Sequence, residues 1–198
     1  MSEQFFLMGE KIILKQVEIR DLKKMSKLAV KWINDGVVTY YLFTGQTPKN
    51  SEQIFNDFKK LLDSHENVIF LIVDKKTKKP IGYTGLYEIN MTARKAEFRV
   101  FILEKSFWGK GLGTEVTELL TFYGFDRLNL NRIYLGFTAD NKGAGKAYKK
   151  AGYEKEGILK QDIYRNSRYY DSVRMAILRA GYYKKQYLEH KNRFSIKQ

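Results

Sequence analysis

The chain has 198 residues, which suits one domain of ordinary size, and its 43% hydrophobic and 29% charged residues are typical of a globular protein. It contains no cysteine, which excludes disulfides, thiolate catalysis and cysteine metal sites, and its two histidines lie far apart, so we expect no metal site. The net charge of +14 favours anionic partners, but the basic residues are scattered, so charge alone does not separate an enzyme from a nucleic-acid-binding protein.

The sequence carries no sign of a membrane span or of a secretory signal. No apolar run approaches the roughly 20 residues that a membrane-spanning helix needs. The first ten residues include Glu3 and Glu10 around a short apolar patch, so we expect a cytoplasmic protein. Without repeats or a proline-rich linker, we expect one domain over residues 1–181 and a looser basic tail over residues 182–198.

The first third of the chain predicts one strand followed by two helices. The strand covers residues 11–16. Asp21 is expected to cap the first helix, whose apolar residues recur at helical spacing until residues 34–36 stop it. Asn50 and Gln53 have the spacing of a capping box and are expected to begin the second helix.

The remaining elements change from consecutive strands to an alternation of helices and strands. Three strands are expected in succession, over residues 68–74, 80–89 and 96–103. After them we expect a helix from Gly111, a strand over 132–138, a helix capped by Asp140 or Asn141, and a hairpin with arms over 153–164 and 169–178. This order predicts an α/β fold with a mixed sheet of about seven strands and helices on both faces.

A glycine-rich segment, Trp108-Gly-Lys-Gly-Leu-Gly-Thr114, lies between a predicted strand and a predicted helix. Glycines let the backbone turn tightly, and the free N–H groups at a helix start attract phosphate. The segment is not a P-loop, because Thr114 and Glu115 follow Gly113 where that motif has Lys and Ser or Thr. It is not a dinucleotide fingerprint either, because Gly111 and Gly113 are two rather than three positions apart.

The segment does resemble the acetyl-CoA loop of the GCN5-related N-acetyltransferases, the GNAT superfamily. Residues 96–115, Ala-Glu-Phe-Arg-Val-Phe-Ile-Leu-Glu-Lys-Ser-Phe-Trp-Gly-Lys-Gly-Leu-Gly-Thr-Glu, are similar to the branch that acetylates the N-termini of ribosomal proteins. A second signature, Asn-x-x-Ala-x-x-x-Tyr-x-x-x-Gly-Tyr, covers residues 141–153, and residues 163–171 of the hairpin are similar to that branch too. The resemblance covers about residues 12–178.

The resemblance implies a GNAT-like fold and direct transfer of an acetyl group from acetyl-CoA to a primary amine, without a metal. The backbone of the glycine-rich segment would hold the cofactor, Lys110 and Lys146 would add charge, and Asn141 would both cap a helix and bind the cofactor. Many family members have Gln or Arg where Trp108 stands, so we expect altered cofactor affinity rather than lost function. The expected cofactor-binding residues are Phe101, Ile102, Leu103, Trp108, Gly109, Lys110, Gly111, Leu112, Gly113, Thr114, Asn141 and Lys146.

Two side chains are candidates for the proton transfers. Tyr148 falls on the general-acid tyrosine of the family, which protonates the departing thiolate; the alternative is that it is the polar end of an aromatic core residue. Glu97 is the candidate for removing the proton of the attacking amine, directly or through a water, and an ion pair between Glu97 and Arg99 is an equal alternative. Glu88 is a weaker candidate. A backbone N–H between residues 100 and 103 would stabilise the developing oxyanion.

The aromatic residues between the first two helices have two interpretations. In the family this region lines the acceptor side, so Trp32, Tyr40, Tyr41 and Phe43 fit the wall of an acceptor pocket. Aromatic residues more often pack a core or a loop, and for that reason we do not count them as site residues.

The acceptor stays open at this point. The most similar branch favours a ribosomal-protein N-terminus, and the positive charge suits docking near RNA. A nucleotide-linked amino sugar fits as well. A polyamine fits less well, because a cationic acceptor is repelled at long range unless a local acidic pocket overrides that. The alternative to an enzyme is a non-catalytic, basic nucleic-acid-binding module. A homodimer is compatible with the enzyme and with this module. Neither function needs a membrane.

Overall fold

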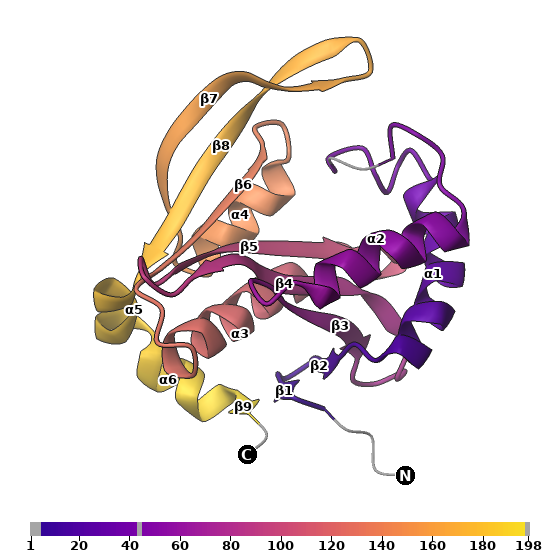
Figure 1. Cartoon of the computed structure of the whole chain (residues 1–198). Coiled ribbons are helices and arrows are strands. Elements are labelled where there is room, and N and C mark those ends of the chain that lie inside the picture. The colour runs from indigo at the N-terminus through magenta and orange to yellow at the C-terminus, as the bar shows by residue number, and fades with distance from the viewer. Residues whose placement is uncertain (1–4, 43–44, 197–198) are drawn as a thin grey trace.

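The computed structural model describes residues 5–42 and 45–196, and the strands of this part form one mixed sheet (Figure 1). The order across the sheet is β7-β8-β6-β5-β4-β3-β2-β1-β9. The strands are β1 Leu7–Met8, β2 Ile12–Gln16, β3 Val68–Asp74, β4 Pro80–Asn90, β5 Lys95–Ile102, β6 Arg132–Thr138, β7 Glu154–Arg165, β8 Arg168–Leu178 and β9 Ser195–Ile196. The nine strands correct the expected seven. The two extra ones, β1 and β9, are two residues long, which is too short to show a period of two.

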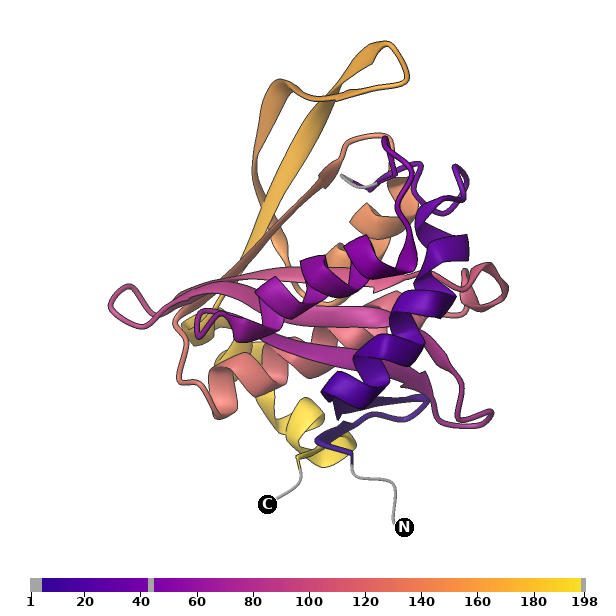
Figure 2. The same ribbon diagram turned by 45° about the vertical axis from the view of Figure 1, so that its right-hand side comes forward.

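Helices cover both faces of the sheet, as predicted (Figure 2). On one face, α1 (Ile19–Ile33) and α2 (Ser51–Asp63) enclose one hydrophobic core; on the other, α3 (Leu112–Asp126) and α4 (Lys142–Lys150) enclose a second. A short 3₁₀ turn, Lys105–Phe107, precedes α3. None of the described helices is long and apolar enough to cross a membrane.

The first two helices begin differently from one another. The Asn50 side chain accepts a hydrogen bond from the Gln53 N–H at 2.9 Å and the Gln53 side chain accepts one from the Asn50 N–H at 2.9 Å, so the predicted capping box of α2 is confirmed. The predicted cap of α1 is wrong by three residues, because Glu18 is the N-cap and Asp21 lies inside the first turn. A carboxylate there still complements the positive end of the helix dipole.

The chain after β8 is packed, where the sequence predicted a looser tail. It forms α5 (Arg179–Lys185), α6 (Tyr187–Arg193) and β9, which pairs with β1. Tyr182 and Phe194 are buried, with ring centroids 4.9 Å from Phe125 and 6.3 Å from Phe122 of α3. The sequence suggested a loose tail because the segment contains many Lys and Arg residues. These residues lie on the same short helices as the buried aromatic residues, so the basic composition does not reveal the apolar side of the helices.

The sheet opens between β5 and β6, the parallel pair in its centre. Their pairing covers only Lys95–Glu97 against Arg132–Tyr134. Beyond it, β5 continues beside β4 as far as Ile102, while β6 continues beside β8 as far as Thr138. The two halves of the sheet therefore diverge, and alternate backbone N–H and C=O groups of β5 point into the opening instead of toward a strand.

Candidate active site

A cavity of about 800 Å³ lies where the two halves of the sheet diverge. Four segments line it: the loop after α1, the end of β5, the glycine-rich segment and the inner side of α4. The lining residues are Gly36, Val37, Val38, Tyr40, Tyr41, Leu42, Val100, Phe101, Ile102, Leu103, Phe107, Trp108, Gly109, Gly111, Leu112, Gly113, Thr114, Asn141, Gly143, Ala144, Lys146, Ala147, Tyr148 and Lys150. Most of the residues expected from the sequence to bind the cofactor are thus brought together.

The glycine-rich segment presents the start of α3 to this cavity. Gly109 and Gly111 have φ angles of +73° and +80°, in the left-handed region that favours glycine. Gly111 is the N-cap of α3 and offers no side chain to the first N–H groups of the helix. These N–H groups and the positive end of the helix dipole make a site for a phosphate group.

Trp108 ties this segment to β5. Its indole N–H donates a hydrogen bond to the Ile102 carbonyl at 2.7 Å, and its ring is exposed at the cavity. Trp108 therefore holds the glycine-rich segment against the end of β5.

Two lysines of α4 lie along the cavity, Lys146 and Lys150. Lys150 was missed from the sequence, although its place four residues after Lys146 puts it on the same side of the helix. Lys110, by contrast, is not among the lining residues. Its ammonium lies 5.2 Å from the centre of the Phe107 ring, and its contribution to cofactor binding stays a prediction.

Asn141 begins α4 at the edge of the cavity. Its side-chain oxygen accepts a hydrogen bond from the Ala144 N–H at 3.0 Å, which confirms the capping role. The same residue lines the cavity, so its amide N–H₂ is placed to meet a ligand while its oxygen holds the helix.

Tyr148 is a residue of both the core and the cavity. Its ring packs against Phe98 and Phe137, with centroids 6.2 and 5.5 Å away, and only 9% of the residue is exposed. Burial raises the pKa of the Tyr148 hydroxyl to about 12, so the phenol is protonated at neutral pH. Within the described part of the chain the hydroxyl has no hydrogen-bond partner, which leaves its proton available to a group in the cavity.

Glu97 lies at the closed end of the opening and forms an ion pair. Arg99 donates to it from Nε at 3.0 Å and from Nη2 at 2.5 Å, and also donates to Glu88 at 3.0 Å. The alternative that the sequence left open, a Glu97–Arg99 pair, is therefore formed. Glu97 is not among the residues that line the cavity, and its service as a base stays a prediction.

The aromatic residues near α1 divide between the core and the cavity. Tyr40 and Tyr41 line the cavity, with their rings edge to face at 4.8 Å. Trp32 is buried among α1, α2 and the sheet. Phe43 lies outside the described residues.

Comparison with known proteins supports the resemblance. A family model described as an acetyltransferase (GNAT) domain matches residues 11–154. The spermidine N(1)-acetyltransferase of Escherichia coli (strain K12) is 32% identical over 182 residues, which cover 90% of this chain and 89% of the relative. A putative ribosomal N-acetyltransferase of Bacillus subtilis (strain 168) is less similar, 25% identical over 176 residues, which cover 86% of this chain and 93% of the relative.

Solved structures agree with this assignment of fold. The spermidine N-acetyltransferase of Vibrio cholerae, crystallised with CoA and spermine, superimposes with a TM-score of 0.76 at 29% identity and covers 87% of this chain and 98% of its own. A dodecameric structure of that enzyme has a TM-score of 0.71 at 28% identity, covering 89% and 98%.

Proposed function

The chain belongs to the GNAT family of N-acetyltransferases, and from this membership we propose that it transfers the acetyl group of acetyl-CoA to a primary amine of a polyamine such as spermidine. That the chain is an acetyl-CoA-dependent N-acetyltransferase follows from the family; the polyamine is our proposal. One observation of the structure supports acetyl transfer most strongly: the cavity at the opening between β5 and β6 combines a helix start suited to an anion, an unpaired strand edge and a protonated tyrosine.

The chemistry assigns one task to each part of the cavity. The N–H groups of α3, with Lys146 and Lys150, would hold the phosphates of acetyl-CoA, and the free edge of β5 would hold its pantetheine arm. The amine nitrogen then attacks the thioester carbonyl carbon, a backbone N–H of β5 stabilises the oxyanion, and the carbon–sulfur bond breaks. Tyr148 gives its proton to the departing thiolate. Burial disfavours a thiolate too, which makes proton transfer from a phenol of raised pKa less uphill.

The choice of a polyamine over a ribosomal-protein N-terminus rests on the relatives. Those named for spermidine are the more similar ones, and the relative named for ribosomal acetylation is more distant. The net charge of +14 opposes a cationic acceptor at long range, so local carboxylates must attract it. We propose that Glu88 and Glu97, which both accept from Arg99 near the last pair of β5 and β6, provide this attraction, and that Glu97 receives the proton of the amine through a water.

We also propose that the chain forms a homo-oligomer, for which the dodecameric relative is the support. Light scattering on the purified protein measures this directly. A monomer at all concentrations would contradict it without bearing on the acetyl transfer.

The acceptor is tested by measuring CoA release from acetyl-CoA with three classes of amine: spermidine and spermine, N-terminal peptides, and a nucleotide-linked amino sugar. We expect release with the polyamines, strongly reduced in the Tyr148→Phe variant. Release with peptides alone would overturn the polyamine proposal. If none of the three classes causes CoA release and the protein binds RNA in a salt-dependent way, the non-catalytic nucleic-acid-binding module is favoured instead.

A further inference from the structure

Arg165, the last residue of β7, buries a positive charge without a counter-charge. The residue is only 5% exposed, and no carboxylate pairs with it in residues 5–42 and 45–196. Its Nη1 donates to the Tyr40 carbonyl, its Nη2 donates to the Leu42 carbonyl at 2.8 Å, and its buried Nε has no partner. Burying a charge is costly, and Arg99 and Arg132 of the same sheet pair with carboxylates. Stability alone therefore does not explain why a charged residue is buried at position 165.

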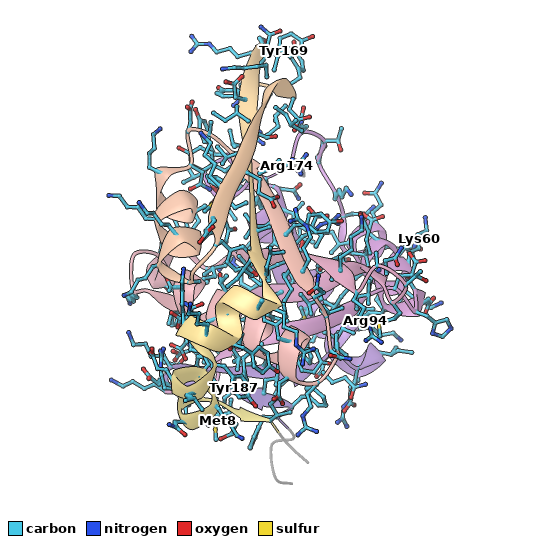
Figure 3. The ribbon with its side chains drawn as sticks, turned by 90° about the vertical axis from the view of Figure 1, so that its left-hand side faces the viewer. Met8, Lys60, Arg94, Tyr169, Arg174 and Tyr187 are labelled. Atoms are coloured by element: carbon cyan, nitrogen blue, oxygen red, sulfur yellow. The ribbon has the colours of Figure 1, made fainter. Side chains whose placement is uncertain are left out.

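The hairpin that carries Arg165 extends past the rest of the sheet. The pairing of β6 with β8 ends at Thr138 and Ser172, so the outer part of the β7–β8 hairpin has no third strand. Figure 3 shows Tyr169 at its tip, beyond Arg174. A two-stranded ribbon is marginal by itself in water, so its position depends on what its tip touches.

The tip touches the loop after α1, which forms one wall of the cavity. We call residues 36–42 the 36–42 wall, since six of them line the cavity. Arg165 makes two hydrogen bonds to this wall, and after the wall Gln46 Nε2 donates to the Tyr164 carbonyl of the hairpin at 3.2 Å. On its other side the wall meets the start of α4, where the Tyr41 hydroxyl donates to the Asp140 carbonyl at 3.4 Å. The hairpin thus holds a segment that lies more than 120 residues away in the chain.

The wall is suited to the acceptor rather than to the cofactor. Its side chains in the cavity are aliphatic and aromatic, Val37, Val38, Tyr40, Tyr41 and Leu42, and offer no cation to a phosphate. The groups fit for phosphates and pantetheine come from residues 100–114 and from α4. The 36–42 wall is then left to close the cavity around the amine.

We propose that Arg165 is a positioning residue for the acceptor: by holding the carbonyls of Tyr40 and Leu42, it fixes the 36–42 wall and so sets the affinity for the amine. The inference rests on the proposed function, since it takes the cavity to be the site of transfer. Arg165 acts through the wall and touches no reacting atom.

The test compares three variants in the full chain. Arg165→Met removes both bonds with little change in length; Arg165→Lys keeps the charge and an ammonium able to reach a carbonyl; Arg168→Met changes an exposed arginine across the same turn and is the matched control. We expect Arg165→Met to raise KM for the polyamine about tenfold or more, while kcat and the Kd of acetyl-CoA change by less than about threefold. Arg165→Lys should recover part of the loss, and Arg168→Met should match the wild type.

Two results would overturn the proposal. One is an unchanged amine KM in folded Arg165→Met. The other is a parallel loss of kcat, amine affinity and acetyl-CoA affinity, which a merely structural role predicts. If Arg165→Met does not fold, Gln46→Ala is the deciding variant, because it removes the bond between the hairpin and the segment that follows the 36–42 wall, and it should raise the amine KM alone.

Hydrogen exchange of residues 36–42 separates this inference from the proposed function. Exchange there should rise in Arg165→Met and not in Arg168→Met, whichever amine is acetylated. If the wild type acetylates no polyamine but exchange still rises, the proposed acceptor is wrong and the contact stands. If polyamines are acetylated and exchange is unchanged, Arg165 does not hold the wall.

Discussion

Glu97 of β5 and Tyr134 of β6 are the last residues that pair these two strands, and from them onward the sheet is open. This one register position explains why the cavity forms where it does. Because the opening widens toward the ends of both strands, residues 100–103 and the start of α4 face each other across it. The chemistry proposed here depends on that separation, since a paired β5 would have no backbone groups left to offer.

Replacing Tyr148 with Phe keeps the ring against Phe98 and Phe137 and removes only the hydroxyl. We expect kcat to fall about a hundredfold, as for the loss of a general acid, with little change in the Kd of acetyl-CoA. Because burial raises the pKa of Tyr148 to about 12, this group should cause no alkaline loss of wild-type kcat below about pH 11. Steady-state kinetics across pH measures both effects, and an unchanged kcat in the variant would leave Tyr148 as a core residue.

Replacing Gly111 with Val should abolish tight binding of acetyl-CoA. A Cβ at Gly111 would meet nothing within 4 Å, so there is space for a side chain. The obstacle is the φ angle of +80°, because a β-branched residue such as Val strongly disfavours positive φ. The loop would have to turn differently and the N–H groups of α3 would lose their orientation. Gly157→Val is the matched control, with open space and an ordinary φ in β7. Titration calorimetry with acetyl-CoA should show a loss in the first variant only; equal affinity in both would refute the loop assignment.

Much of the fold was predictable because its signals are local. The bounds of β3 and β6 are as predicted: β3 is a short apolar run before a polar turn, and β6 lies between the loop after α3 and the cap of α4. The capping box of α2 and the cap of α4 depend on residues three apart and were also predictable. Within the hairpin the predicted four-residue turn is shorter in the structure, because Asn166 and Ser167 both adopt positive φ and allow a two-residue turn.

What escaped prediction depends on distant parts of the chain. The burial of Tyr182 and Phe194 follows from α3, which lies more than 50 residues earlier. The contacts of Arg165 with Tyr40 and Leu42 have no trace in the local sequence of either segment. Residue types alone also could not decide between a base and an ion pair for Glu97, since a carboxylate beside an arginine suits both.

The role of Glu97 is accessible through a pair of variants. If Glu97 takes the proton of the amine, Glu97→Gln should lower kcat/KM for the polyamine about tenfold at neutral pH, and less as the pH approaches the amine pKa of about 10. Arg99→Met breaks the ion pair but keeps the carboxylate, so it should cost much less. The measurement is kcat/KM against pH for both. An equal loss in the two variants, independent of pH, would show that only the ion pair matters.

The stability of the fold should fall as the pH is lowered, through the buried His190. The Tyr182 hydroxyl lies 2.9 Å from its Nδ1, and burial, followed by the charge of Arg193, lowers the pKa of His190 from 6.5 to about 4. Above pH 6.5 His190 is neutral in both the folded and the unfolded chain, so it does not reduce the free energy of unfolding. Between pH 6.5 and 4 only the unfolded chain takes up the proton, and up to about 3 kcal/mol of unfolding free energy is lost.

Urea unfolding at about pH 7.5 and about pH 4.5 measures this difference. His190→Gln, which does not titrate, should lose less than the wild type over that interval, and His65→Gln, at an exposed histidine, should behave like the wild type. An equal loss in wild type and His190→Gln would place the acid sensitivity in other groups.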